Sequence, residues 1–219
     1  MESSRCNNPD GCVSANKAHR AAATEKRRGH LAGPLISLLF CMLPLPFLCG
    51  IYPVVHFTEE QIDIRVCPDE VIVDGYYVYQ NPFPFPVSQG FIIPFPVDDR
   101  HLGPSFLQVR QLQPEEKDIG PWYMLGVNRF SLTFKANGTC RVHVRYRQKV
   151  IGESASYILV TTKPWRRPLQ RTVYRMFPEG VEISASNYGL SRQARDFLEF
   201  RRENFMPDED WSFSWKLKN

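Results

Sequence analysis

The pattern of hydrophobic and polar positions divides the chain at one uncharged segment. No residue from Leu31 to Val55 carries a charge, and these 25 positions are enough for a helix to cross a hydrocarbon core about 30 Å thick. Pro44 and Pro46 interrupt the segment, which weakens a straight helix without forbidding it. We therefore predict a retained transmembrane signal-anchor over residues 31–55, with a cleaved signal peptide or a buried soluble helix as alternatives.

Residues 56–219 follow short patterns of period two, separated by Pro, Gly and Asn. Such runs are typical of an antiparallel β-sandwich of the Ig-like kind, so we expect a mainly β domain over 56–219. The candidate strands are Gln61–Cys67, Val71–Gln80, Phe91–Val97, Phe106–Gln113, Arg129–Lys135, Cys140–Lys149, Ser156–Thr162, Thr172–Phe177, Val181–Ser186 and Trp211–Leu217.

One hairpin is predicted in detail from the parity of its apolar residues. The even-numbered positions are apolar in both Phe130–Phe134 and Cys140–Arg147. A three-residue loop, 136–138, would bring these positions into register, with Gly138 at positive φ. Asn137 in that loop starts the sequon Asn-Gly-Thr, which makes it a candidate glycosylation site in a host that glycosylates.

The C-terminal part is expected to contain the one helix of the domain. Residues 191–204 suit a short helix that Ser191 caps, and Pro207 would end it. The following run alternates cleanly and predicts a final strand that buries Trp211, Phe213, Trp215 and Leu217.

The charges fall unevenly on the two sides of the apolar segment. The chain has 27 Lys+Arg against 23 Asp+Glu, a net +4, of which residues 1–30 hold +3 and residues 56–219 hold +1. Basic residues on the N-terminal flank predict that a disordered tail, 1–30, stays in the cytoplasm. The C-terminal domain would then be exported, to the periplasm or the extracellular space.

Two cysteines lie in the predicted exported domain, Cys67 and Cys140. An oxidising compartment favours a disulfide between them, and two unpaired buried thiols are the alternative.

A Pro-Phe segment provides candidate partner residues. The tetrapeptide Pro-Phe-Pro-Val occurs twice, at 84–87 and 94–97, and proline cannot donate to a strand ladder. Either Phe83, Phe85 and Phe95 form a surface for a partner, or their rings cap the sandwich core. The loop around Trp165-Arg166-Arg167 offers a second candidate surface, because an exposed Trp beside Arg can stack on a ring.

The same segment carries a family resemblance. A strand ending in Tyr-Gln-Asn-Pro (79–82), then Phe-Ile-Ile-Pro-Phe-Pro (91–96) and the later Arg-Tyr-Arg-Gln (145–148) resemble the VIT-type β-sandwich modules of inter-α-trypsin-inhibitor-like proteins. The similarity spans roughly residues 70–160. It implies a secreted-type, VIT-like sandwich for adhesion or assembly, and it transfers no catalytic residues. The anchor and the C-terminal extension depart from that family.

A search for chemistry finds no catalytic, cofactor-binding or metal-binding motif. The polar cluster 98–101 is the densest and is either a site or a hydrophilic loop, and the acidic run 208–210 is either a calcium ligand set or a solvated turn. Arginines on the strand 140–149 lack the interleaved aromatics of a nucleic-acid platform, so we expect no nucleic-acid partner.

The sequence therefore predicts a membrane-anchored, exported binding or assembly module without catalytic activity or cofactors. Its partners would be the lipid bilayer, through residues 31–55, and a protein at or outside the membrane. Two alternatives remain, an accessory subunit of a larger membrane complex and an exported hydrolase whose site assembles only in space.

Overall fold

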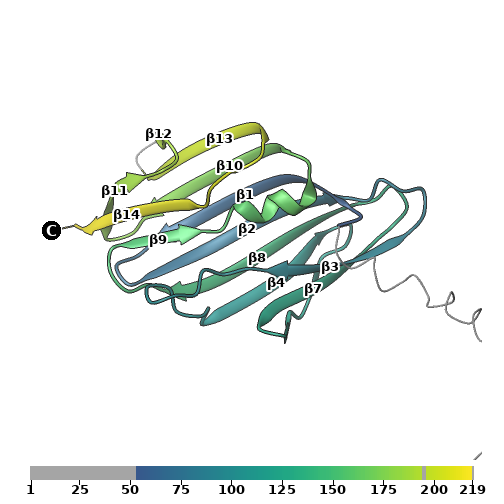
Figure 1. Ribbon diagram of the computed structural model, residues 1–219, viewed down its shortest axis with the longest axis horizontal. Helices are drawn as coiled ribbons and strands as arrows, with labels where there is room; N and C mark the ends of the chain where they lie inside the picture. Colours follow the sequence, from purple (N-terminus) through teal and green to yellow (C-terminus); the bar gives the residue numbers. More distant parts are fainter. Residues whose placement is uncertain (1–52, 194–195, 219) are drawn as a thin grey trace, which may run out of the picture. The chain divides into compact units, whose positions relative to one another are not determined.

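The computed structural model describes residues 53–193 and 196–218 (Figure 1). The predicted tail and residues 31–52 of the predicted anchor lie outside this part. Within the described residues, no helix has the length and apolar character needed to span a membrane. Val55, the last residue of the predicted anchor, is buried in an apolar cluster of the domain.

The described chain forms one large sheet and two small ones, and the large sheet has eight strands. In spatial order these are β12 (Ser191–Gln193), β13 (Phe197–Phe205), β10 (Leu169–Pro178), β1 (His56–Val66), β2 (Glu70–Gln80), β8 (Thr139–Lys149), β4 (Phe106–Gln113) and β5 (Lys117–Asp118). One small sheet has the order β11 (Val181–Ser186), β14 (Trp211–Leu217) and β9 (Ser154–Tyr157), and the other has the order β3 (Val87–Ile93), β7 (Val127–Phe134) and β6 (Trp122–Met124).

The mainly β architecture with sheets packed face to face is confirmed. Each of the ten predicted strands corresponds to an observed one, although Phe91–Val97 is shifted to Val87–Ile93 and Ser156–Thr162 to Ser154–Tyr157. The expectation of purely antiparallel pairing is wrong at one place, because β1 and β10 run parallel. The chain passes through β2 to β9 before β10 returns beside β1, and parallel neighbours need such a long crossover.

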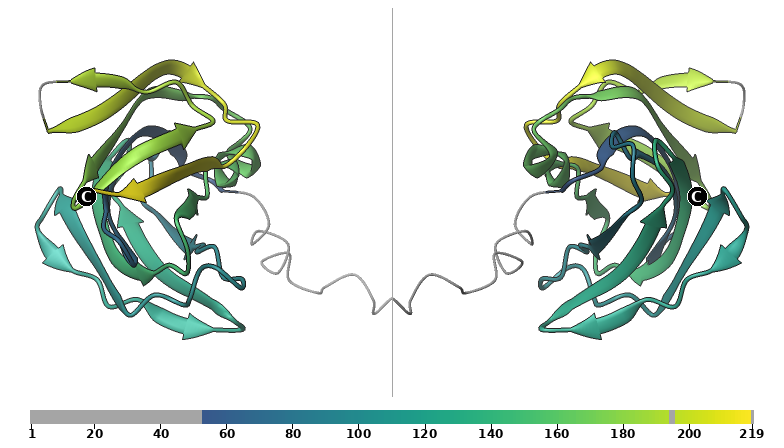
Figure 2. Two further views of the ribbon diagram at one scale, coloured as in Figure 1. Left: turned by 90° about the vertical axis from the view of Figure 1, so that its left-hand side faces the viewer. Right: turned by 90° about the vertical axis from the view of Figure 1, so that its right-hand side faces the viewer.

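The two small sheets cover different halves of the large one (Figures 1 and 2). The buried apolar residues form two clusters. The cluster beneath β9, β11 and β14 contains Trp211 and Trp215, both almost without solvent exposure. The cluster beneath β3 and β7 contains Phe130 and Phe134. Tyr77 packs against both clusters, so it marks the line along which they meet.

The predicted hairpin of β7 and β8 is wrong, although the predicted inward faces are confirmed. The even-numbered residues of 130–134 and of 140–148 are buried, but β7 pairs with β3 and β6, whereas β8 pairs with β2 and β4. The same pattern of buried even-numbered residues arises when two strands belong to different sheets and face each other across a core, so it does not identify a hairpin. The connecting turn places Asn137, not Gly138, at positive φ (51°).

The predicted helix at 191–204 is also wrong, because this segment forms β12 and most of β13. Strand β13 pairs with β10 from Leu169 to Met176, and its Phe200 ring stacks on Tyr174 at 4.5 Å. The open edge of β10 and the apolar partner ring override a weak helix preference. The final strand is confirmed, except that Leu217 is 56% exposed.

The predicted disulfide is wrong because its cysteines lie at opposite ends of β2. Cys67 sits in the β1–β2 turn, where its N–H donates to the Glu70 carbonyl at 2.9 Å. Cys140 on β8 is opposite Tyr79 of β2, and Tyr79 lies nine residues after Glu70, the first residue of β2. At about 3.3 Å per residue they are roughly 30 Å apart, whereas a bridge needs Cα atoms within about 7 Å. Both thiols are free.

Candidate functional site

An aromatic cavity of about 360 Å³ lies where the two apolar clusters meet. Strands β1, β2 and β8 of the large sheet form its floor, and β3 and β9 contribute from the two small sheets. Residues of η2 (Val160–Trp165), a 3₁₀ helix, complete the wall. Eight of the side chains that line it are aromatic: Phe57, Tyr77, Tyr79, Phe91, Phe130, Tyr146, Tyr157 and Trp165.

The shape of the cavity depends on one glycine in β2. Gly75, Tyr77 and Tyr79 share the inward face of this strand, because every second side chain points the same way. A Cβ atom on Gly75 would overlap the hydroxyl end of the Tyr77 ring. The missing side chain therefore lets Tyr77 fold back along the sheet, where its hydroxyl lies 2.8 Å from that of Tyr157.

A buried carboxyl group stands among these tyrosines. Glu60 on β1 lines the cavity and is only 6% exposed. The Tyr174 hydroxyl donates to Glu60 Oε2 at 2.6 Å, and the Tyr157 hydroxyl lies 3.5 Å from Oε1. Burial raises the pKa of Glu60 from 4.5 to about 7, against the opposing effect of the tyrosine hydrogen bonds. Its charge therefore changes within the physiological pH range.

No described residue supplies a counter-ion to Glu60, since none of the ion pairs among residues 53–193 and 196–218 includes it. Glu60 was not among the candidate residues predicted from the sequence. The sequence did contain a signal for it, because Glu60 alternates in step with Ile62, Ile64 and Val66 and therefore lies on the buried face of β1. A carboxyl on the core face of a strand is unusual and indicates a special role.

Two features predicted from the sequence, the acidic run 208–210 and Trp165, lie at the two ends of helix η2. Asp210 Oδ1 accepts hydrogen bonds from the N–H groups of Leu159 and Val160 at 2.9 and 3.1 Å, and so holds the start of the helix. In the described residues no acidic cluster is suited to a metal ion. At the other end, the Trp165 ring lies 5.5 Å from Tyr79 and 5.6 Å from Phe57. Trp165 therefore lines the cavity, and it is half-buried rather than an exposed partner residue.

The remaining predicted partner residues do not share one environment. Phe95 is half-buried and packs edge-on against Tyr146 at 4.8 Å, as a core-capping ring does. Phe83 and Phe85 are exposed and stack on each other at 5.2 Å. Arg166 and Arg167 are exposed beside η2. The candidate surface is therefore divided between core and solvent.

The exposed Phe loop is held by Asn81, which has no solvent exposure. Its amide donates to the carbonyls of Phe85 and Lys135 at 2.8 and 2.9 Å, and its oxygen accepts from the Phe83 N–H at 3.0 Å. Asn137 lies next to this loop, exposed, with its N–H donating to the Phe83 carbonyl at 2.8 Å. Glycosylation of Asn137 stays a prediction.

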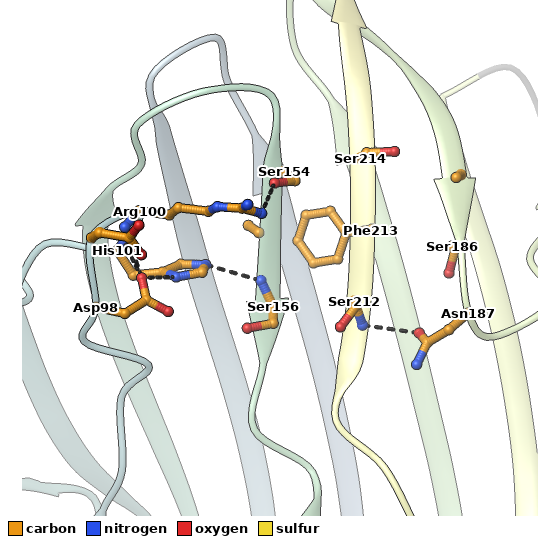
Figure 3. Close-up of a pocket in the computed structure, with 13 residues that line it drawn as sticks. Asp98, Arg100, His101, Ser154, Ser156, Ser186, Asn187, Ser212, Phe213 and Ser214 are labelled. Atoms are coloured by element: carbon orange, nitrogen blue, oxygen red, sulfur yellow. Dashed lines mark hydrogen bonds and ion pairs between the residues drawn. The ribbon is translucent and has the colours of Figure 1, made fainter.

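A second, polar concavity of about 670 Å³ lies on the outer face of the β9–β14–β11 sheet (Figure 3). Ser154 and Ser156 from β9 and Ser212 and Ser214 from β14 line it, and the predicted polar cluster 98–101 lies beside β9. These serines occupy outward positions of their strands, and the residues between them, such as Ala155 and Phe213, are buried in the core. The arrangement offers hydroxyl groups to a polar ligand.

His101 in this concavity is held from both ring nitrogens. Its Nδ1 lies 2.8 Å from Asp98 Oδ1, and its Nε2 accepts from the Ser156 N–H at 3.1 Å. The hydrogen bond to His101, with two backbone N–H groups, lowers the pKa of Asp98 to about 2. Ser154 contacts Arg100 Nη1 at 3.4 Å and no imidazole. Within the described residues this concavity thus lacks a serine paired with a free histidine base.

A third feature, which our sequence analysis missed, is an exposed apolar hairpin. Strand β6 and its turn carry Trp122, Tyr123, Met124 and Leu125, and the last is 86% exposed. Leu125 and Gly126 have φ of 53° and 81°, the conformation of a tight two-residue hairpin turn. The signal in the sequence was four consecutive apolar residues directly before a glycine.

Comparisons with known proteins show similarity at the level of the fold. No family model and no curated protein matches the sequence. A proposed nutrient-binding protein from Legionella pneumophila has a similar structure, with a TM-score of 0.59 at 13% identity, over 76% of this chain and 68% of that one. An M1 zinc metallopeptidase from Deinococcus radiodurans has a TM-score of 0.43 at 7% identity, and this chain spans 42% of its length. The first likeness shows a shared fold.

Proposed function

We propose that this protein is an exported, membrane-anchored binding module that holds a small, mostly apolar ligand in the aromatic cavity. The observation that carries the proposal is the cavity itself, whose walls are aromatic and whose one acidic group, Glu60, faces it from β1. Ligand sites in proteins are typically concave, mostly apolar and equipped with a few polar groups that fix orientation. The volume of about 360 Å³ suits a molecule with one ring and a short chain.

The proposed location rests on the sequence. The uncharged segment 31–55 and the +3 charge of residues 1–30 favour a retained anchor with the domain on the exported side. The VIT-type resemblance stays a prediction, and it agrees with an exported binding role. The nutrient-binding assignment proposed for the Legionella protein is also compatible with a ligand-holding domain of this fold.

A non-catalytic role is favoured over the hydrolase alternative by the arrangement around His101. A general base needs a free nitrogen directed at a nucleophile, whereas His101 Nε2 is occupied by the Ser156 N–H. The buried carboxyl, Glu60, is surrounded by tyrosine hydroxyls rather than by a serine or a cysteine. This environment suits recognition of a polar head group.

The proposal is tested by following Trp165 while a small aromatic probe is added. In the full-length protein labelled with 5-fluorotryptophan, 2-phenylethanol should shift the ¹⁹F resonance of Trp165 and leave that of Trp215 unmoved. Thr161 is exposed and lines the cavity, so Thr161→Phe should obstruct it and abolish the shift. Thr133→Phe, the same change at an exposed position of β7, is the control. A Trp165 resonance that never moves would overturn the proposal.

Assembly with a protein partner is a second candidate function, favoured by the hairpin Trp122–Leu125. Four adjacent apolar side chains in solvent exceed the scattered exposure usual for monomers. Gentle detergent extraction with a C-terminal tag should recover a partner with the wild type and lose it with Leu125→Asp. Ser131→Asp adds the same charge at an exposed position of the neighbouring strand β7 and serves as the control. Extraction as a lone monomer would contradict this role.

A further inference from the structure

We propose that the ligand of the aromatic cavity is an organic ammonium ion, whose charged nitrogen pairs with Glu60 while its apolar part lies against the aromatic wall. This inference rests on the function proposed above and names the chemical class that the cavity selects. Three features of the site carry it: the donors around the carboxyl, the missing counter-ion and the aromatic wall.

The hydroxyls around Glu60 are arranged as donors to a carboxylate. Tyr174 donates to Oε2 at 2.6 Å, a short hydrogen bond of the kind that a carboxylate accepts. Tyr157 lies 3.5 Å from the other oxygen and is in turn 2.8 Å from Tyr77, so a chain of hydroxyls leads toward the carboxyl. Burial raises the pKa of all three tyrosines well above their usual value, which keeps them protonated and able to donate.

The carboxylate has hydrogen-bond donors but no cation. A buried charge is stable only when it is paired, and among the described residues no Lys, Arg or His forms an ion pair with Glu60. Two other acidic residues of β1 do have partners: Glu59 pairs with Arg171, and Asp63 pairs with Arg175. A cationic ligand would supply the missing charge, because Glu60 lines the cavity.

A metal cation fits this environment less well than an organic one. Calcium requires six to eight oxygen ligands, and the described residues contain no cluster of three metal-binding side chains. The rings beside Glu60 are instead those of Tyr77, Tyr79 and Tyr157, all of which line the cavity. Aromatic faces attract ammonium groups through their quadrupole, most strongly where water is excluded.

The apolar part of the ligand would lie against an aromatic group on the cavity wall. The Trp165 ring centroid lies 5.6 Å from that of Phe57 and 6.0 Å from that of Phe91, and all three rings line the cavity. A ring of the ligand would pack against this group rather than insert between its members, because they already contact one another. The site thus favours an arylalkylamine over a bare ammonium ion.

Binding of such a cation has a proton balance that can be measured. The titratable groups around the Glu60 carboxyl are the hydroxyls of Tyr77 and Tyr79 on β2, Tyr157 on β9 and Tyr174 on β10, and burial raises the pKa of each, so none titrates near neutrality. At pH 7 about half of Glu60 holds its proton, because its pKa is about 7. An ammonium ligand requires the carboxylate, so binding releases about half a proton to solvent, whereas a neutral ligand releases none.

The test compares three probes that differ only in the head group: 2-phenylethylamine, 2-phenylethanol and 3-phenylpropionate. Calorimetric titration of the full-length protein should give at least about tenfold tighter binding of the amine than of the alcohol, since charge-assisted hydrogen bonds exceed neutral ones. The anion should bind weakest. Titration in two buffers of different ionisation enthalpy measures the released proton.

The variant Glu60→Gln keeps the shape of the side chain and removes its charge. It should lower the affinity for the amine about tenfold and that for the alcohol much less, because only the amine loses a charge-assisted hydrogen bond. Glu59→Gln makes the same change on the neighbouring residue, which pairs with Arg171, and should leave all three affinities unchanged.

The outcomes separate the two proposals. Equal binding of the three probes, with Trp165 responding to each, overturns the ammonium inference and leaves the binding function standing. No binding of any probe, with no response of Trp165, overturns both. Tighter amine binding that persists in Glu60→Gln assigns the charge recognition elsewhere and overturns the inference.

Discussion

Replacing Glu60 by Gln should change how the stability of the domain depends on pH. In the folded protein the pKa of Glu60 is raised from 4.5 to about 7, so between these values the folded state holds a proton that the unfolded state has lost. Stability from this group is therefore complete below about pH 4.5 and falls as the pH rises toward 7. In Glu60→Gln this contribution to the pH dependence is absent.

The magnitude follows from the size of the pKa shift. A rise from 4.5 to about 7 corresponds to about 3 kcal/mol at about 1.4 kcal/mol per pKa unit. Glu60 is 6% exposed, so solvent screening reduces this value little. Relative to its own stability at pH 4.5, the wild type should lose about 3 kcal/mol by pH 8 through this group, and Glu60→Gln should not.

Urea unfolding of both proteins at intervals from pH 4.5 to 8.5 measures the effect. The difference between the two unfolding free energies cancels the titration of all other groups and should change with a slope of about 1.4 kcal/mol per pH unit below pH 7. Glu59→Gln controls for the loss of one charge at this strand. Parallel curves for wild type and Glu60→Gln would refute the reasoning, because the carboxyl would then titrate as it does in water.

Two substitutions test the packing around the cavity and the Phe83–Phe85 loop, and one mapping experiment tests the state of the cysteines. Gly75→Ala should destabilise the domain by about 1–3 kcal/mol, since a methyl group would displace the Tyr77 ring; an unchanged urea midpoint would contradict this. Asn81→Ala should cost about 3 kcal/mol through its three lost hydrogen bonds, measured in the same way, and a loss below about 1 kcal/mol would argue against the buried role. Peptide mapping under non-reducing conditions should find Cys67 and Cys140 both alkylated after unfolding; a linked peptide pair would contradict the fold.

Much of the secondary structure could be predicted because alternation is a local property. The pattern in Phe130–Phe134 and in 140–147 correctly identified the buried face of each strand. It did not identify the neighbours, because the same faces are buried whether two strands pair or oppose each other across a core. The helix expected at 191–204 failed for a related reason, since only the open edge of β10 made the extended form better.

The candidate site was far less predictable. Trp165 was identified as a functional candidate from its two arginine neighbours, but its role comes from Phe57, Tyr79 and Phe91, which lie far away in the sequence. The only sign of Glu60 in the sequence was its position in the alternating pattern of β1, which places it on the buried face. The predicted disulfide between Cys67 and Cys140 was wrong because an oxidising compartment favours disulfides in general but does not show whether two cysteines lie close together in the fold.

The sequence by itself determined the class of fold, the inward face of each strand and the division of charge about the apolar segment, because each depends on residues close together in the chain. The tertiary structure decided the pairing of the strands, the parallel contact of β1 with β10 and the cavity where the two clusters meet. The physical reason is that a cavity is bounded by side chains from separate sheets. The environment of Glu60 exists only once β1, β2, β9 and β10 have packed together.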